Sequence, residues 1–284
     1  MTTRKIFILT FTFFISLCNG QMRDRLHNDD LKRQKLNGKV NEVEYREYEV
    51  SQMNDTSYIY KLNFEPFINC HFDLTFNKNG YLINKKEYYA NKELIVKAEE
   101  WSYEYNKKDI IINEQKISFK YPDTTIWKYS FPNKDSVIIE QKDRMLGTLF
   151  YSYVQESEKE KLYTRRKETP FKISSIFYYD KKGRIYKNET YTLDTMYSKK
   201  IYEYLDSKSN NISNEKYIYK ETPIFFESKK YDKENNVIIS YNQDKKVIQS
   251  FEYIYDKENN WIEKKTFSRI GKLVKLAKRK ITYF

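Results

Sequence analysis

The sequence has few of the residues that carry recognisable chemistry, and this scarcity limits its possible functions. It contains two cysteines, Cys18 and Cys70, and two histidines, His27 and His71. A zinc site needs ligands that converge from several positions, whereas Cys70 and His71 are neighbours whose side chains would point to opposite faces of a strand. We therefore predict no metal site and no cofactor.

Glycine is also scarce, with six in the chain. This excludes a glycine-rich phosphate loop. No nucleophile elbow is present, and only two histidines could serve as a base, so a Ser/His/Asp or Cys/His arrangement has no support. The sequence predicts a protein that is not an enzyme and has no catalytic residue. One alternative stays open because acidic residues are plentiful, namely a carboxylate pair that acts on a glycan.

Long apolar runs are lacking except at the start of the chain. Residues 6–17 are mostly apolar, follow Arg4 and Lys5, and precede small residues at 18–20, which is typical of a signal peptide over residues 1–20. The run is shorter than the roughly 20 residues that span a bilayer. We expect an exported protein (secreted, periplasmic or at the cell surface) without a transmembrane segment after cleavage. Lipid attachment at Cys18 is the alternative, since residues 15–18 resemble a bacterial lipobox except for the bulky Leu17.

Cleavage would leave Cys70 as the single cysteine, so stability must come from packing and strand pairing rather than from disulfides. It would also lower the formal net charge from +12 to +10, because Arg4 and Lys5 are removed. Lysines and acidic residues are interleaved along the chain, and the one concentrated basic patch lies at residues 272–280. We predict no nucleic-acid partner, because this pattern lacks a basic binding stripe.

Aromatic residues are abundant instead, with 28 tyrosines and 18 phenylalanines. Many of them precede a turn made of Asp or Asn, Lys, and then Gly or Asn, as at residues 179–183 and 255–260. The copies recur in steps of 22 to 29 residues, a spacing typical of one supersecondary unit stacked many times. The leading aromatic residues are Phe76, Tyr105, Phe131, Tyr153, Tyr179, Tyr204, Tyr231 and Tyr255.

The segments before these turns alternate in polarity. Trp101 and Tyr103 alternate with Ser102 and Glu104, which is the period of two that indicates a β-strand. We predict an all-β fold: an elongated, curved antiparallel β-meander of about eight hairpin-like repeats, as an open half-barrel or a single-layer sheet. The domain organisation is a signal peptide at 1–20, a polar lead-in at 21–37 and a single β-repeat domain at 38–284.

The turn residues have a physical explanation. Asp or Asn at the first turn position can bond the backbone two residues further on. Gly80, Gly183 and the asparagines at 235–236 and 259–260 tolerate a positive φ angle. These features predict short hairpin loops, formed by type I turns with a bulge.

The turn at 255–260, followed by residues 261–264, resembles the YD repeats of RHS-type proteins. It is more similar to small exported proteins of certain Gram-negative bacteria that carry degenerate YD-like repeats, whose mature chains often begin with a segment similar to residues 36–43, followed by Tyr45 and Tyr48. The resemblance covers residues 36–284 and implies an antiparallel β repeat outside the cytoplasm. It implies no reaction, and the toxin-enclosing shell of RHS proteins proper is not carried over, because this chain is too short.

One face of the predicted sheet is aromatic, and flat rings can stack on sugars. The candidate binding residues are Trp101, Tyr103, Trp127, Tyr129, Tyr253 and Trp261. The same rings could instead make cross-strand pairs that hold a thin sheet together. We predict an exported, non-catalytic binding or interaction module of the cell envelope, with a polysaccharide or an envelope protein as partner. The alternatives are a purely structural envelope component and the glycan-active enzyme mentioned above; the oligomeric state is left open.

Overall fold

The computed structural model describes residues 34–52, 58–63, 71–91, 94–107, 109–119, 123–133, 136–143, 147–158, 161–169, 173–180, 184–193, 195–205 and 211–284. All regular secondary structure in these ranges is β-strand. The predicted signal peptide, and the predicted lead-in up to residue 33, lie outside the described residues. The strands are β1 (Val40–Gln52), β2 (Tyr58–Leu62), β3 (His71–Phe76), β4 (Leu82–Asn91), β5 (Leu94–Tyr105), β6 (Ile111–Ser118), β7 (Asp123–Asn133), β8 (Ser136–Asp143), β9 (Gly147–Glu158), β10 (Lys161–Thr169), β11 (Ile173–Tyr179), β12 (Ile185–Thr192), β13 (Thr195–Tyr204), β14 (Ile212–Tyr219), β15 (Thr222–Tyr231), β16 (Val237–Tyr241), β17 (Val247–Tyr255), β18 (Trp261–Ser268) and β19 (Leu273–Tyr283).

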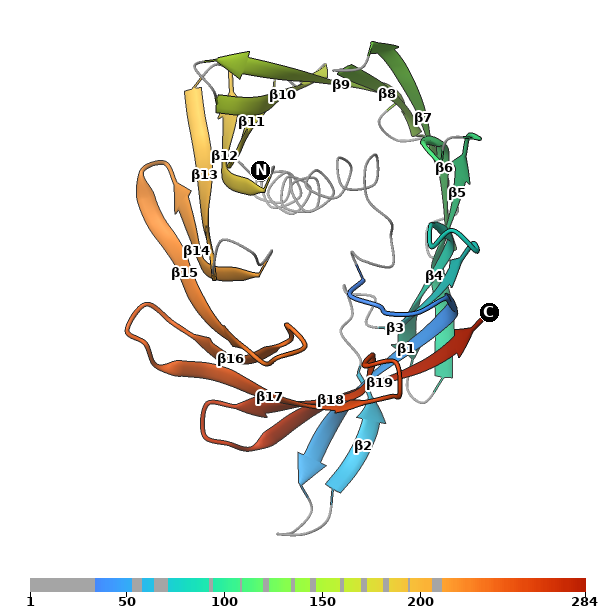
Figure 1. Ribbon diagram of the computed structural model, residues 1–284, viewed down its shortest axis with the longest axis vertical. Helices are drawn as coiled ribbons and strands as arrows, with labels where there is room; N and C mark the ends of the chain where they lie inside the picture. Colours follow the sequence, from blue (N-terminus) through green and yellow to red (C-terminus); the bar gives the residue numbers. More distant parts are fainter. Residues whose placement is uncertain are drawn as a thin grey trace.

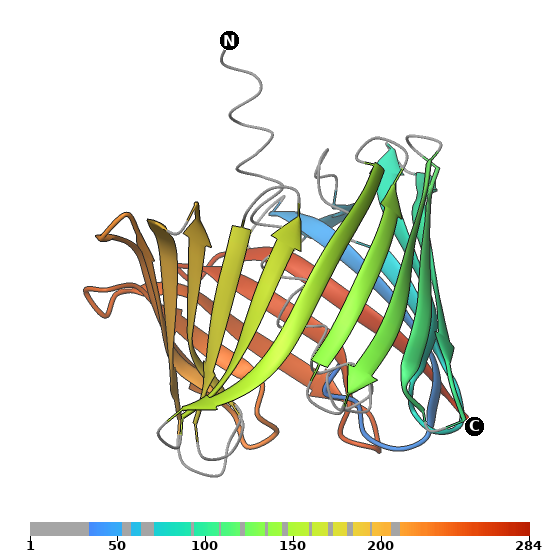
Figure 2. The same cartoon turned by 90° about the horizontal axis from the view of Figure 1, so that it is seen from above.

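The strands form one antiparallel meander. From β3 to β19, each strand pairs with the next strand along the chain. β1 pairs with β19 on one side and with β2 and β3 on the other, so the two ends of the meander meet. Figure 1 shows the strands arranged around a ring, and Figure 2 shows a wall one strand thick. The predicted all-β fold, a curved single-layer antiparallel meander, is confirmed.

The predicted repeat corresponds to one hairpin of the meander. The strands from β3 to β18 make eight hairpins, and each of the eight leading aromatic residues lies on the first strand of one of them. All eight connections between the two strands of a hairpin lie at the same end of the ring, because successive strands are antiparallel. Tyr153 differs from the other seven, since β9 continues beyond it to Glu158 and the turn follows only there.

Five of the eight hairpin turns share one hydrogen-bond pattern. In the turn at 255–260, the Asp256 carboxylate accepts the Asn260 N–H at 2.9 Å, while the Asp256 N–H donates to the Asn260 carbonyl at 2.9 Å. The same two bonds recur at 76–81, 105–110, 179–184 and 231–236. Asn259 has a φ of 59°, which asparagine tolerates. A register shift at each of these strand ends confirms the predicted bulge.

Buried and exposed side chains lie on opposite faces of the wall. Tyr129, Ile139 and Tyr151 are paired across β7, β8 and β9 and are 8%, 0% and 5% exposed, whereas Ile138 and Phe150 on the other face are 38% and 49% exposed. A curved sheet crowds the side chains on its concave side, so we take the buried face as the inner face of the ring. The main hydrophobic cluster comprises Leu36, Val40, Val43, Leu74, Phe76, Leu82, Tyr103, Ile111, Tyr129, Val137, Ile139, Leu149 and Tyr151.

Candidate functional site

Trp101 on β5 and Trp127 on β7 form an aromatic pair on the inner face. Their ring centroids lie 5.5 Å apart and their planes differ by 12°. Both indoles are half-buried and pack against the main hydrophobic cluster, and the Trp101 Nε1–H is buried without an acceptor among the described residues. We call Trp101, Trp127 and Lys116, the β6 residue opposite Trp101, the first cluster.

The two predicted tyrosines beside this pair have a different environment. Tyr103 and Tyr129 are 5% and 8% exposed and belong to the hydrophobic cluster. The Tyr129 hydroxyl donates to the buried Glu114 carboxylate at 2.7 Å. These two residues therefore stabilise the wall, whereas Trp101 and Trp127 remain partly accessible.

The charges around the first cluster are paired. Lys116 Nζ lies 2.7 Å from Glu99 Oε1 and 5.2 Å from the centroid of the Trp101 ring. Lys85 forms an ion pair with Glu87, which lies directly opposite Glu99 across the β4–β5 ladder. Each of the two facing carboxylates thus has its own lysine.

The other two predicted residues, Tyr253 and Trp261, meet at a second place on the inner face. Their ring centroids are 6.1 Å apart, and Tyr45 of β1 also approaches Trp261 at 6.1 Å, edge to face. Tyr45 stacks on Phe72 of β3 at 4.4 Å, with planes 2° apart. These contacts reach across β19 and connect β1 with β17 and β18. We call Tyr45, Tyr253, Trp261, Lys264 and Arg279 the second cluster.

The cations of the second cluster have little compensation. The Arg279 guanidinium carbon lies 3.6 Å from the centroid of the Trp261 ring, and its Nε and Nη1 are buried without an acceptor among the described residues. Burial lowers the pKa of Arg279 to about 10. Lys264 Nζ lies 4.5 Å from the centroid of the Phe251 ring, and burial lowers its pKa as well. Both cations are thus held where the charged form is disfavoured.

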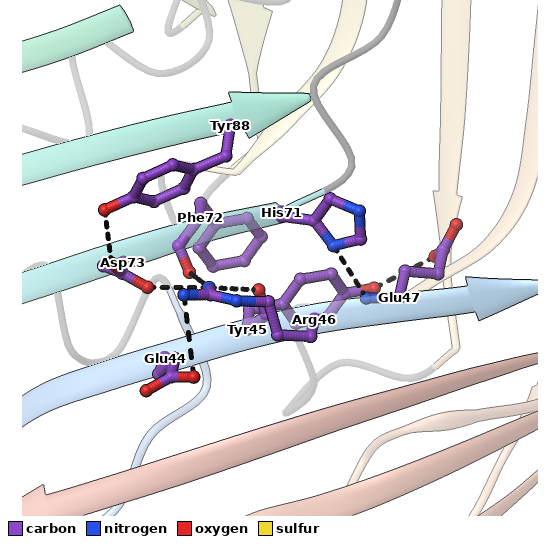
Figure 3. A network of polar contacts seen from close by, with 8 residues as sticks. All are labelled: Glu44, Tyr45, Arg46, Glu47, His71, Phe72, Asp73 and Tyr88. Atoms are coloured by element: carbon purple, nitrogen blue, oxygen red, sulfur yellow. Dashed lines mark hydrogen bonds and ion pairs between the residues drawn. The ribbon is translucent and has the colours of Figure 1, made fainter. Parts of the chain in front are cut away.

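Arg46, on the outer face of β1, shows how a fully paired arginine is held in the same wall (Figure 3). Its Nη1 donates to the Asp73 carboxylate at 2.7 Å and to the Tyr45 carbonyl at 2.8 Å. Asp73 also accepts the Tyr88 hydroxyl at 2.6 Å, and Arg46 Nη2 lies 3.6 Å from Glu44. Burial, followed by the bond to Asp73, raises the pKa of Tyr88.

His71 occupies a structural position at the start of β3. Its Nδ1 accepts the Glu47 N–H at 3.1 Å, so Nε2 carries the hydrogen that is donated to the Asn63 carbonyl at 3.2 Å. The side chain is fully buried, and burial lowers its pKa.

The described residues contain no group of three or more metal-ligating side chains, and Cys70 lies outside them. No helix within the described ranges has the length and apolar character needed to cross a membrane.

The structure therefore places the six predicted site residues in two groups on the wall. β3 and β4 separate β1, which contributes Tyr45 to the second cluster, from β5 of the first cluster. Trp101, Tyr103, Trp127 and Tyr129 lie together, and Tyr253 and Trp261 lie apart from them. The sequence reasoning missed Arg279 as a site residue and counted it in the basic patch at 272–280. Strand alternation places the residues of this patch on different faces of β19. Lys278 and Lys280 are exposed, whereas Arg279 shares a face with the buried Ala277.

Comparisons with known proteins give no family. No family model matches the chain, and no curated protein matches it. Among solved structures, it is similar to a porin-like protein from Bacteroides uniformis, with 9% identity and a TM-score of 0.43 over 86% of this chain and 98% of the other. A porin-like protein from Bacteroides vulgatus gives 9% identity and a TM-score of 0.34 over the same shares. A TcdB2-TccC3-Cdc42 structure gives 8% identity and a TM-score of 0.18 over 72% of this chain and 19% of the other. The resemblance to YD repeats stays a prediction.

Proposed function

We propose that the chain is an exported, non-catalytic β-repeat protein of the cell envelope that binds a polysaccharide on the inner face of its ring. The observation that carries the proposal is the half-buried pair of Trp101 and Trp127. Two nearly parallel indoles, fixed by the pairing of β5 and β7 with the intervening β6, are a preorganised apolar surface for sugar rings. Paired charges beside them, Lys116 with Glu99 and Lys85 with Glu87, supply polar groups that orient a ligand.

The envelope-protein partner and the purely structural role remain the alternatives. The burial of Tyr103, Tyr129 and Trp261 supports the structural role, because these rings make cross-strand contacts that hold the wall together. The glycan-active enzyme has less support. Glu87 and Glu99 face each other, but the carboxylate of each is already paired with a lysine.

A panel of immobilised polysaccharides tests the proposal. The wild-type protein should bind at least one member, and Trp127→Ala should weaken that binding about tenfold or more, since burial of a large apolar side chain contributes roughly 1.5–3 kcal/mol. Phe150→Ala is the matched control, because Phe150 is an aromatic residue on the outer face. Its affinity should equal that of the wild type.

Two results would reject this function. Equal binding by Trp127→Ala and Phe150→Ala would show that the inner aromatic pair is not the site. Absence of binding to every polysaccharide would favour the structural role. Release of sugar from a bound polymer, abolished by Glu99→Gln in a folded variant, would instead establish the enzyme.

A further inference from the structure

The second cluster contains an excess of positive charge on one small part of the inner face. Lys264 pairs with Ala277 across β18 and β19, and Arg279 and Lys275 flank Ala277 on β19. Glu47, which lies opposite Ala277 on β1, is the carboxylate closest to this group in the cross-strand register. It already pairs with Lys275 at 3.2 Å.

Arg279 consequently lacks a compensating carboxylate among the described residues, and Lys264 feels only Glu47, which already pairs with Lys275. A buried or half-buried charge without an ion pair is costly in a folded protein. The same wall satisfies Arg46 with Asp73 and Glu44, so pairing is readily available to an arginine in this fold. The missing anion at Arg279 and Lys264 is therefore the feature that requires an explanation.

We propose that Arg279 and Lys264 form a binding site for the carboxylate of an acidic polysaccharide, that is, a polymer of uronic acids. This inference rests on the proposed function and specifies the substrate class. A guanidinium suits a carboxylate because its planar N–H donors match the two oxygens. Lys264 is a diagonal neighbour of Arg279 across the β18–β19 ladder, so both cations border the same part of the inner face.

The surroundings favour a sugar acid over a free inorganic anion. The Arg279 guanidinium lies against the Trp261 ring, and Tyr45 and Tyr253 border that ring. Tyr45 and Tyr253, which are partly exposed, offer apolar surface to a pyranose ring next to the charged group, while the buried Trp261 supports the guanidinium. A small anion would use the charges alone, whereas a uronic acid unit uses both the charges and the rings.

The test measures the affinity of the full chain for sodium polygalacturonate by isothermal titration calorimetry at low salt. The wild type should bind, and Arg279→Met should weaken binding at least tenfold. Lys278→Met is the matched control, because it removes the same charge from the adjacent, exposed position on the outer face of β19. It should bind within twofold of the wild type. Lys264→Met provides a second variant with an expected loss of at least fivefold, and circular dichroism verifies the fold of each.

Further binding measurements identify the source of the anion and distinguish a failure of this inference from a failure of the proposed function. Neutral dextran should bind at least tenfold more weakly than polygalacturonate, and 10 mM acetate should not displace the polymer. Equal losses in Arg279→Met and Lys278→Met would overturn the site, as would displacement by acetate or tighter, Arg279-dependent binding to phosphatidylglycerol vesicles. If Arg279→Met binds polygalacturonate like the wild type while Trp127→Ala does not, only this inference fails. If no polysaccharide binds at all, the proposed function fails with it.

Discussion

The two aromatic clusters of the inner face use the same kinds of ring but balance their charges differently. In the first cluster, Lys116 lies over Trp101 and is paired with Glu99 at 2.7 Å. In the second cluster, Arg279 lies over Trp261 at 3.6 Å and has no paired carboxylate among the described residues. Aromatic rings are therefore common to both clusters. The clusters differ in whether the cation beside the ring has a carboxylate partner, and the cluster without one can accept an anion from a ligand.

The largest expected effect compares the tryptophans of the two clusters. Trp261 is 9% exposed, whereas Trp127 is half-buried. Trp261→Ala should lower the free energy of unfolding by about 3 kcal/mol. Trp127→Ala should lower it by roughly half as much, because less apolar area returns to water. Urea unfolding followed by circular dichroism measures both values. A loss at Trp127 as large as that at Trp261 would contradict the assignment of Trp127 to a binding surface.

Removal of one cation from each cluster should have opposite effects on stability. Arg279→Met replaces an uncompensated charge by an apolar side chain and should raise the free energy of unfolding by about 1 kcal/mol in the absence of ligand. Lys116→Met leaves Glu99 without its partner and should lower it by about 1 kcal/mol. Thermal and urea unfolding of the two variants give the comparison. Destabilisation by Arg279→Met would show that its charge is satisfied, and the contrast between the clusters would disappear.

The sequence predicts the repeat better than it predicts the site, and individual residues show why. The turn at 255–260 is local, since Asp256 bonds Asn260 four residues away, so the turn chemistry can be read from adjacent letters. The alternation of Trp101 and Tyr103 with polar residues likewise indicates strands. The environment of Arg279 is not local, because it depends on the pairing of β19 with β1 and β18. Tyr153 shows the same limit, because neighbouring pairing extends β9 beyond the expected turn.

The meeting of β1 with β19 is another long-range feature that the sequence does not show. Local turns favour curvature of the meander but do not determine whether its ends meet. Asn37 near the start of the described chain donates its N–H to Asn260, and Asn260 donates back to the Asn37 carbonyl at 2.9 Å. Tyr283 near the end donates to Asp256 in the same turn at 2.5 Å. The last repeat turn is thus where Asn37 and Tyr283, near the two ends of the described meander, are both held, and this is visible only once the ring has formed.

The smallest expected effect at neutral pH concerns His71, whose Nδ1 accepts the backbone N–H of Glu47, two residues from Tyr45 of the second cluster. In the unfolded chain, His71 should bind a proton with a pKa of about 6.5. Burial lowers its pKa in the folded protein, so the unfolded state binds more protons once the pH falls below about 6.5. The stabilisation is fully present above that pH and is lost as the pH falls toward the folded pKa, at no more than about 1.4 kcal/mol per pH unit.

Urea unfolding between pH 8 and pH 5 measures this dependence. His71→Gln should flatten the decline in stability below pH 6.5, even if it lowers stability at every pH. His27→Gln is the control for the other histidine and should keep the wild-type slope. The first cluster has no histidine among its residues, so Lys116→Met should also keep that slope. An unchanged slope in His71→Gln would mean that His71 titrates equally in the folded and unfolded states, and acid would then act on both clusters alike.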